Sequence, residues 1–161
     1  MADINYPYIP EGRSIKYVDE KNSVMWLAKK IARNFSLDKT MPGAAVVVKD
    51  GKVLGMGANG SNYHKEHQCQ RVILGCKTGE GYEFCEGCSP KNHSEAKAIK
   101  NVQDMGNETK GADLYLWGHW WCCKWCWDAM IEAGISNVYL LTRSEVLFNK
   151  NHSDNMVGKQ F

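Results

Sequence analysis

Hydrophobic and polar positions along this chain alternate between helical spacing and short apolar runs, which predicts helices alternating with strands. From about residue 16 to 34, apolar side chains recur every three or four positions, which predicts a helix that ends before Pro42-Gly43. Residues 44–49 form an apolar run typical of a buried strand. Asp50-Gly51 then predicts a two-residue hairpin turn into an antiparallel strand at about residues 53–56.

The second half of the chain repeats this alternation. Residues 94–105 and 123–133 have helical spacing, and a glycine follows each of them. Residues 113–117 and 137–141 have the length and apolar content of strands. Helices and strands in this order predict an α/β protein with a mixed sheet covered by helices on both faces.

Residues 61–92 show no periodicity, and they contain four of the cysteines. A loop of this length inside a compact domain is unusual unless it is functional or held by another interaction. No repeat or linker divides the chain. We therefore expect residues 1–161 to form a single domain with a cysteine-rich insert at about residues 62–92.

Composition narrows the possible partners. With 161 residues and 43% hydrophobic side chains, the chain is long enough to bury a core. Its apolar runs are too short to span a bilayer, and residues 1–5 do not resemble a signal peptide, so we expect a cytoplasmic protein without a membrane partner. A net charge of +2 without a basic run argues against nucleic acid and leaves a small anionic substrate open. Seven cysteines in a reducing compartment indicate metal binding or catalysis.

The strongest chemical signal is His93-Ser94-Glu95, followed about thirty residues later by Cys123 and Cys126 in a Cys-x-x-Cys pair. One imidazole and two thiolates supply three ligands for tetrahedral zinc and leave a fourth position for water, as in catalytic sites. Both halves lie at predicted helix N-termini, whose partial positive charge favours the thiolate. This composite motif is typical of zinc nucleobase deaminases.

The chemistry of such a site assigns roles to its residues. Zinc lowers the pKa of its water from 15.7 towards about 7. We expect Glu95 to take the proton of this water, pass it to the ring nitrogen and assist the departure of ammonia. Ser94 is expected to donate to the exocyclic group of the base. Two alternatives stay open: a structural zinc site completed by a fourth residue, and Glu95 as an ordinary helix-start glutamate.

From about residue 43 to 141 the chain resembles the cytidine and deoxycytidylate deaminase superfamily, and most of all its bacterial and phage-type deoxycytidylate deaminases. Besides the zinc motif, Gly57-Ala58-Asn59-Gly60-Ser61 is similar to the family's turn after the second strand. The resemblance implies a three-layer α/β/α sandwich around a five-stranded mixed sheet. It also implies that Asn59 binds the sugar hydroxyl and that the protein is a homo-oligomer.

The chain departs from the family pattern at several positions. Lys97 replaces the asparagine of the His-Ala-Glu-x-Asn-Ala motif, and Cys122 replaces the proline before the first zinc cysteine. The connection through His119, Trp120 and Trp121 is longer than usual. It lies beside the expected entrance for the base, so Trp121 is a candidate substrate contact, with Trp120 as its alternative. His119 is expected to be structural or to line the pocket.

The insert predicts a second, structural zinc ion. Its candidate ligands are Cys69, Cys76, Cys85 and Cys88, of which Cys85-x-x-Cys88 forms a good half-site. A segment without its own core gains order from a metal. The alternatives are reduced thiols in a loop, or His64 or His67 in place of one cysteine.

These features predict a zinc-dependent hydrolytic deaminase of a cytosine nucleotide, most specifically of dCMP to dUMP with release of ammonia. One alternative is a deaminase of another base or of polynucleotide, such as tRNA adenosine or cytidine in single strands. The other is a non-catalytic zinc-binding module on the same fold. The presence of Glu95 favours an enzyme, and an insert that closes the pocket favours a mononucleotide.

Overall fold

A five-stranded mixed sheet forms the centre of the computed structural model, which describes residues 5–77 and 79–157. The ends of the predicted domain, including most of the segment tested for a signal peptide, lie outside these residues. The strands are β1 (Ile15–Val18), β2 (Ala44–Lys49), β3 (Lys52–Ala58), β4 (Asp113–Trp117) and β5 (Asn137–Leu141). They lie in the order β1-β5-β4-β2-β3, with β2 antiparallel to β3 and β4 and the other pairs parallel.

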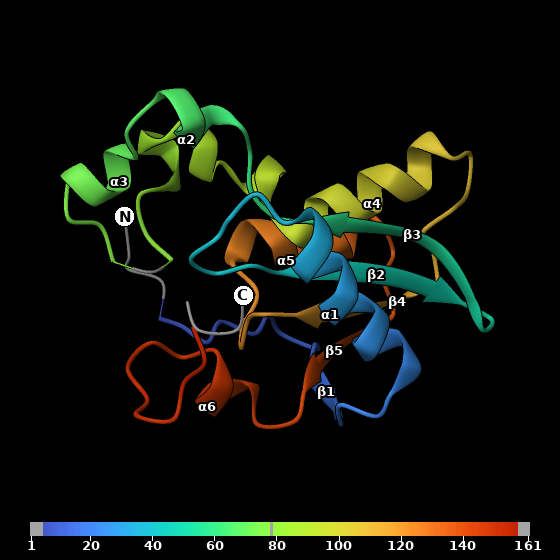
Figure 1. The fold of residues 1–161 in the computed structure, drawn as a ribbon. Coiled ribbons are helices and arrows are strands. Elements are labelled where there is room, and N and C mark those ends of the chain that lie inside the picture. Colours follow the sequence, from blue (N-terminus) through green and yellow to red (C-terminus); the bar gives the residue numbers. More distant parts are fainter. Residues whose placement is uncertain (1–4, 78, 158–161) are drawn as a thin grey trace.

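Helices cover both faces of this sheet (Figure 1). The helices are α1 (Ser23–Phe35), α2 (Tyr63–Glu66), α3 (Gln70–Ile73), α4 (Ser94–Asp104), α5 (Lys124–Glu132) and α6 (Ser144–Leu147). On one face Met25 and Ala28 of α1 pack in a cluster with Val46 of β2. On the other face Val102 of α4 and Trp127 of α5 belong to a second cluster. The predicted α/β/α sandwich with a five-stranded sheet is confirmed. None of the described helices combines the length and the apolar character needed to cross a bilayer.

The predicted helix from about residue 16 is wrong at its start. Ile15–Val18 forms β1, parallel with β5, and α1 begins only at Ser23. Asn22 caps α1, because its Oδ1 accepts hydrogen bonds from the backbone N–H groups of Val24 and Met25 at 3.1 and 3.0 Å. A strand of four residues contains only two repeats of the alternating pattern, so its sequence cannot be distinguished from one with helical spacing.

Strand register brings three loops together at one end of the sheet. Ala44 pairs with Ala58 on one side and with Trp117 on the other. The segments before β2, after β3 and after β4 therefore meet there. The predicted hairpin turn lies at the opposite end, with φ of 52° at Asp50 and 75° at Gly51, both positive as a type I′ turn requires.

The insert forms a lobe that stands off one end of the sheet (Figure 1). It contains the four-residue helices α2 and α3 and the 3₁₀ turns η1 (Tyr82–Phe84), η2 (Glu86–Cys88) and η3 (Pro90–Asn92). Such short elements explain why its sequence shows no periodicity. Arg71 connects its parts by donating to the carbonyls of Glu80 at 2.7 Å and Lys77 at 3.0 Å.

Candidate metal centres and active site

The N-termini of α4 and α5 converge on three metal-binding side chains. His93 is the N-cap of α4, Cys123 is the N-cap of α5, and Cys126 lies in the first turn of α5. The Nδ1 atom of His93 lies 3.3 Å from the sulfur of Cys126 and 3.5 Å from that of Cys123. One donor atom from each residue lies within 4.8 Å of the other two. The fold thus brings together all three predicted zinc ligands.

This donor set fits zinc. With zinc–sulfur bonds of about 2.3 Å and zinc–nitrogen bonds of about 2.0–2.1 Å, a tetrahedron separates nitrogen and sulfur by about 3.6 Å. Both measured distances are close to that value. The hydrogen bond with Cys126 lowers the pKa of Cys123 to about 6, against the effect of burial and with a further contribution from His93. A thiolate is the form that zinc binds.

Glu95 lies in the first turn of α4, beside these donors. It is only 4% exposed. Burial raises the pKa of the Cys122 thiol well above its usual value, and the adjacent charge of Glu95 raises it further. Cys122, which replaces the family's proline, therefore stays protonated against the carboxylate. The Ser94 hydroxyl is also buried and has no hydrogen-bond partner among the described residues. The site thus contains a buried carboxyl side chain and a buried hydroxyl without a described partner.

Asn59 connects the loops at the end of the sheet. Its Oδ1 accepts from the Gly43 N–H at 2.9 Å and from the Ser36 hydroxyl at 2.5 Å. Its Nδ2 donates to the Met41 carbonyl at 2.9 Å. Among the described residues these bonds use one of its two amide hydrogens, and they give Asn59 a framework role that its sequence motif did not indicate.

Lys97 contacts the turn after β3, which contains Asn59 and Gly60. Its Nζ donates to the Gly60 carbonyl, and burial lowers its pKa. The lysine that departs from the family motif therefore ties α4 to the turn that contains Asn59.

His119 is a functional candidate to which sequence reasoning gave little weight. A Cβ on Gly43 would meet its Nε2 at 2.6 Å, so only glycine permits this close approach. Burial, followed by the charge of His93, lowers the pKa of His119 to about 4. The imidazole is therefore neutral at pH 7 and can both donate and accept a hydrogen bond.

Trp121 is partly covered by the N-terminal segment. Its ring contacts that of Tyr6 in a tilted arrangement, with centroids 4.2 Å apart and an angle of 31° between the planes. The Tyr6 hydroxyl accepts from the Lys124 N–H at 3.4 Å, at the start of α5. Sequence reasoning missed Tyr6, because nothing local to residues 5–14 indicates a contact more than a hundred positions away.

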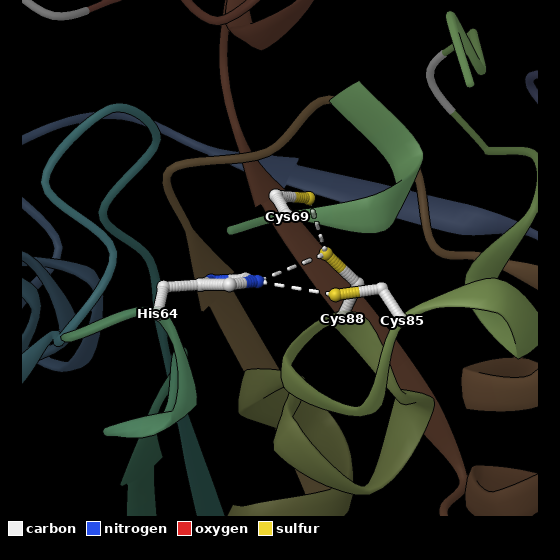
Figure 2. Close-up of side chains that lie close together, drawn as sticks. All are labelled: His64, Cys69, Cys85 and Cys88. Carbon is white, nitrogen blue, oxygen red and sulfur yellow. Dashed lines mark hydrogen bonds between the residues drawn. The ribbon is translucent and has the colours of Figure 1, made fainter. Parts of the chain in front are cut away.

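The insert brings together a second group of metal-binding residues. His64, Cys69, Cys85 and Cys88 each offer a donor atom within 4.8 Å of the other three (Figure 2). The predicted set differs at one position, since His64 is a member and Cys76 is not. Gly75, with φ of 70°, ends the turn after α3, and the Cys76 sulfur packs against Gly81 instead.

His67, the other histidine considered for this group, lies outside it. Its ring stacks on Tyr63 with centroids 4.2 Å apart, and its Nδ1 lies 3.1 Å from the Tyr63 carbonyl.

Known proteins share this fold. The family profile described as "Cytidine and deoxycytidylate deaminase zinc-binding region" matches residues 18–142. A dCMP deaminase from the cyanophage S-TIM5, solved with dCMP and dUMP, is 22% identical with a TM-score of 0.50, over 74% of this chain and 79% of that chain. Its apo form is also 22% identical, with a TM-score of 0.49, over 79% and 87% of the two chains.

A structure from a study of tRNA:A34 deaminases is 22% identical with a TM-score of 0.46, over 84% of this chain and 96% of that chain. No curated protein sequence matches the chain. Of these structures, the nucleotide-bound dCMP deaminase, with a TM-score of 0.50, supports the fold, and at 22% identity it supports nothing beyond the fold. The profile covers well over half of the chain and includes both halves of the zinc motif. The chain therefore belongs to the cytidine and deoxycytidylate deaminase family.

Proposed function

We propose that this protein is a zinc-dependent hydrolytic deaminase that converts dCMP to dUMP and releases ammonia. One observation carries the proposal: His93, Cys123 and Cys126 meet at two helix N-termini beside the buried carboxylate of Glu95. Among the described residues, no fourth histidine, cysteine or acidic side chain joins this group. Three protein ligands leave one coordination position for water, as catalytic zinc requires.

In the proposed reaction Glu95 transfers the protons and Ser94 binds the base. His93, Cys123 and Cys126 would hold the zinc ion, which would lower the pKa of a water molecule towards about 7. Glu95 accepts a proton from the attacking water and delivers it to the ring nitrogen of cytosine. It then takes the remaining proton of the newly added hydroxyl and passes it to the amino group, so that the hydroxyl becomes the carbonyl of uracil. A carbon–oxygen bond replaces the carbon–nitrogen bond, and the amino group leaves as ammonia. The Ser94 hydroxyl donates to the polar edge of the base.

The proposed substrate is a mononucleotide. The family includes deaminases of deoxycytidylate, and the cyanophage relative was solved with dCMP and dUMP. The second amide hydrogen of Asn59, which has no partner in the part of the chain that the structure describes, suits a sugar hydroxyl, and the exposed part of Trp121 suits the face of a base. A net charge of +2 without a basic run offers little to a polynucleotide backbone. We further propose that the protein is a cytoplasmic homo-oligomer of single-domain subunits.

Ammonia release across a panel of substrates tests this proposal. The panel contains cytidine, deoxycytidine, their mono- and triphosphates, adenosine, guanine, single-stranded DNA and tRNA. We expect the highest kcat/KM with dCMP and only a weak dependence on salt. Turnover confined to tRNA or single-stranded DNA, with a steep salt dependence, would instead identify a polynucleotide deaminase.

A non-catalytic zinc-binding module is the remaining alternative. It predicts that the zinc-loaded protein releases no ammonia from any member of the panel. Light scattering on the same preparation tests the proposed oligomer.

A further inference from the structure

The second group of metal-binding residues is assembled from separate short elements of the insert. His64 lies in α2, and Cys69 is the N-cap of α3. Cys85 is the N-cap of η2, and Cys88 is the last residue of η2. Figure 2 shows the four side chains pointing toward one another. Residues scattered over 25 positions of an irregular segment therefore converge on one point.

The distances within this group match a zinc tetrahedron. Bonds of about 2.3 Å to sulfur and 2.0–2.1 Å to nitrogen separate two sulfurs by about 3.8 Å, and nitrogen from sulfur by about 3.6 Å. The sulfurs of Cys69 and Cys88 are 3.6 Å apart. The Nε2 atom of His64 lies 3.2 Å from the sulfur of Cys85 and 4.0 Å from that of Cys88. A disulfide would need sulfurs about 2.05 Å apart, and all three cysteines are free.

The surroundings suit the charge of such a complex. Zinc bound by three thiolates and a neutral imidazole carries a net charge of −1. The guanidinium of Arg71 lies close enough to Cys88 and Cys69 for their charges to interact with it, so it offsets this charge. The same guanidinium binds the carbonyls of Lys77 and Glu80. It therefore connects the sulfur cluster to the rest of the insert.

The helices of the insert contribute no buried residues to a core. The apolar side chains of α3 and its C-cap face solvent, with Val72 78%, Ile73 58% and Leu74 60% exposed. Helices of four residues are unstable alone, since isolated helices shorter than about 12 residues are marginal. Ordering the backbone costs about 1–2 kcal/mol per residue. Metal binding supplies folding free energy to segments of this kind.

We propose that His64, Cys69, Cys85 and Cys88 bind a structural zinc ion that folds residues 62–92 and holds His93 in its ligating orientation. Four protein ligands close the coordination sphere, as in structural zinc sites.

The second part of this proposal rests on the deaminase function proposed above. The Cys88 carbonyl accepts a hydrogen bond from His93 Nε2 at 3.2 Å. This bond fixes the tautomer, and it turns Nδ1 toward Cys123 and Cys126. Only Ser89 and η3 separate Cys88 from His93. Fixing Cys88 therefore fixes the imidazole ring, and losing such outer-shell partners costs about 10–100-fold in metal affinity or activity.

Zinc counting by native mass spectrometry tests the site on the full chain. We expect two zinc ions in the wild-type protein and one in Cys69→Ser. Cys76→Ser is the matched control, because it removes a thiol from the same insert outside the group, and it should keep two ions. His64→Ala should keep one ion, and His67→Ala should keep two. A single zinc in the wild-type protein, or equal loss in Cys69→Ser and Cys76→Ser, would overturn the proposal.

The wild-type count decides the question even if a variant fails to fold. Limited proteolysis of wild-type protein gives a second readout: a strong chelator should expose the insert to cleavage before the rest of the domain. Cys69→His, which restores a zinc ligand, should restore the count of two. An insert that resists protease equally with and without chelator would contradict a folding role for the metal.

Chelator competition tests the link to His93. We expect the zinc retained by Cys69→Ser to bind about 10–100-fold more weakly than the corresponding zinc of Cys76→Ser, with a lower kcat and a similar KM. Equal affinities would refute the link. The two proposals fail separately: two zinc ions without ammonia release would refute the deaminase and leave this site standing. Ammonia release with one zinc would refute this site alone.

Discussion

Replacing Gly57 with alanine tests how closely β3 must approach the helix that carries the candidate site. An added Cβ would lie 2.5 Å from the backbone nitrogen of Ala98 and 2.7 Å from the carbonyl carbon of Lys97. Ordinary contact distances are about 3.5–4.0 Å. Backbone atoms of a helix cannot rotate away, so α4 must move from β3 by about 1 Å, the difference between these distances.

This displacement affects stability and activity differently. Overpacking of this kind costs about 1–3 kcal/mol, and each kcal/mol lowers the Tm of a domain of this size by about 2–4 °C. His93 and Glu95 move with α4, whereas Cys123 and Cys126 remain on α5. The zinc ligands are thereby pulled apart. A misplacement of about 1 Å costs about 100-fold in rate, so we expect that loss in kcat/KM.

Gly55→Ala is the matched control on the same face of the same strand. Its Cβ would meet the Val102 side chain at 2.6 Å and the Val102 nitrogen at 2.9 Å, one helical turn farther from His93. Thermal unfolding and ammonia release are measured for both variants. We expect similar losses in Tm but a much larger loss of activity in Gly57→Ala. Equal activity losses in the two variants would refute the idea that the β3–α4 approach positions the site.

Three further substitutions test individual contacts. Burial lowers the pKa of His119 to about 4, so between pH 6.5 and 4 the unfolded chain binds more protons and stability falls with falling pH, by up to about 1.4 kcal/mol per unit. In urea unfolding at pH 7 and pH 5, His119→Gln should show a smaller loss of stability with falling pH than the wild-type protein. An equal loss in both proteins would contradict the lowered pKa of His119. Lys97→Met removes the hydrogen bond to the Gly60 carbonyl. Because charged hydrogen bonds contribute about 1.5–3 kcal/mol, this variant should raise KM about 10-fold with a smaller change in kcat. An unchanged KM would exclude a role in substrate binding for the turn that contains Asn59 and Gly60. Ser94→Ala removes a buried hydroxyl without a partner among the described residues, so Tm should stay the same or rise while kcat/KM falls; a lower Tm would assign the hydroxyl to the fold.

Features governed by local sequence could be predicted before the structure. The turn at Asp50-Gly51 needs positive φ at both residues, and the sequence supplies the residues that allow it. His93 and Cys123 stand at helix N-termini, where the helical spacing of the sequence begins. Periodicity places Val102 and Trp127 in the core in the same way.

Features governed by tertiary contacts could not be predicted in this way. Ile15–Val18 is a strand because β5 offers a free parallel edge, and Lys16 and Tyr17 carry no local sign of that pairing. Cys85-x-x-Cys88 predicts a zinc half-site from spacing alone. The choice of His64 over Cys76 depends on the direction that Gly75 gives to the chain after α3.

The same limit applies to the surroundings of the active site. The contact between His119 and Gly43 joins two loops that only strand register brings together. The cover of Tyr6 over Trp121 arises in the same way. Neither His119 nor Tyr6 belongs to a motif, so the sequence indicated the candidate zinc ligands better than it indicated the residues around them.

The most direct test of the deaminase function is ammonia release from dCMP by Glu95→Gln, measured together with its zinc content. Glutamine keeps the size of the buried side chain but cannot accept the proton. We predict zinc content equal to that of the wild-type protein and a fall in kcat of about 100- to 10,000-fold. A variant that keeps its zinc and releases ammonia at the wild-type rate would contradict the role of Glu95 and the mechanism built on it.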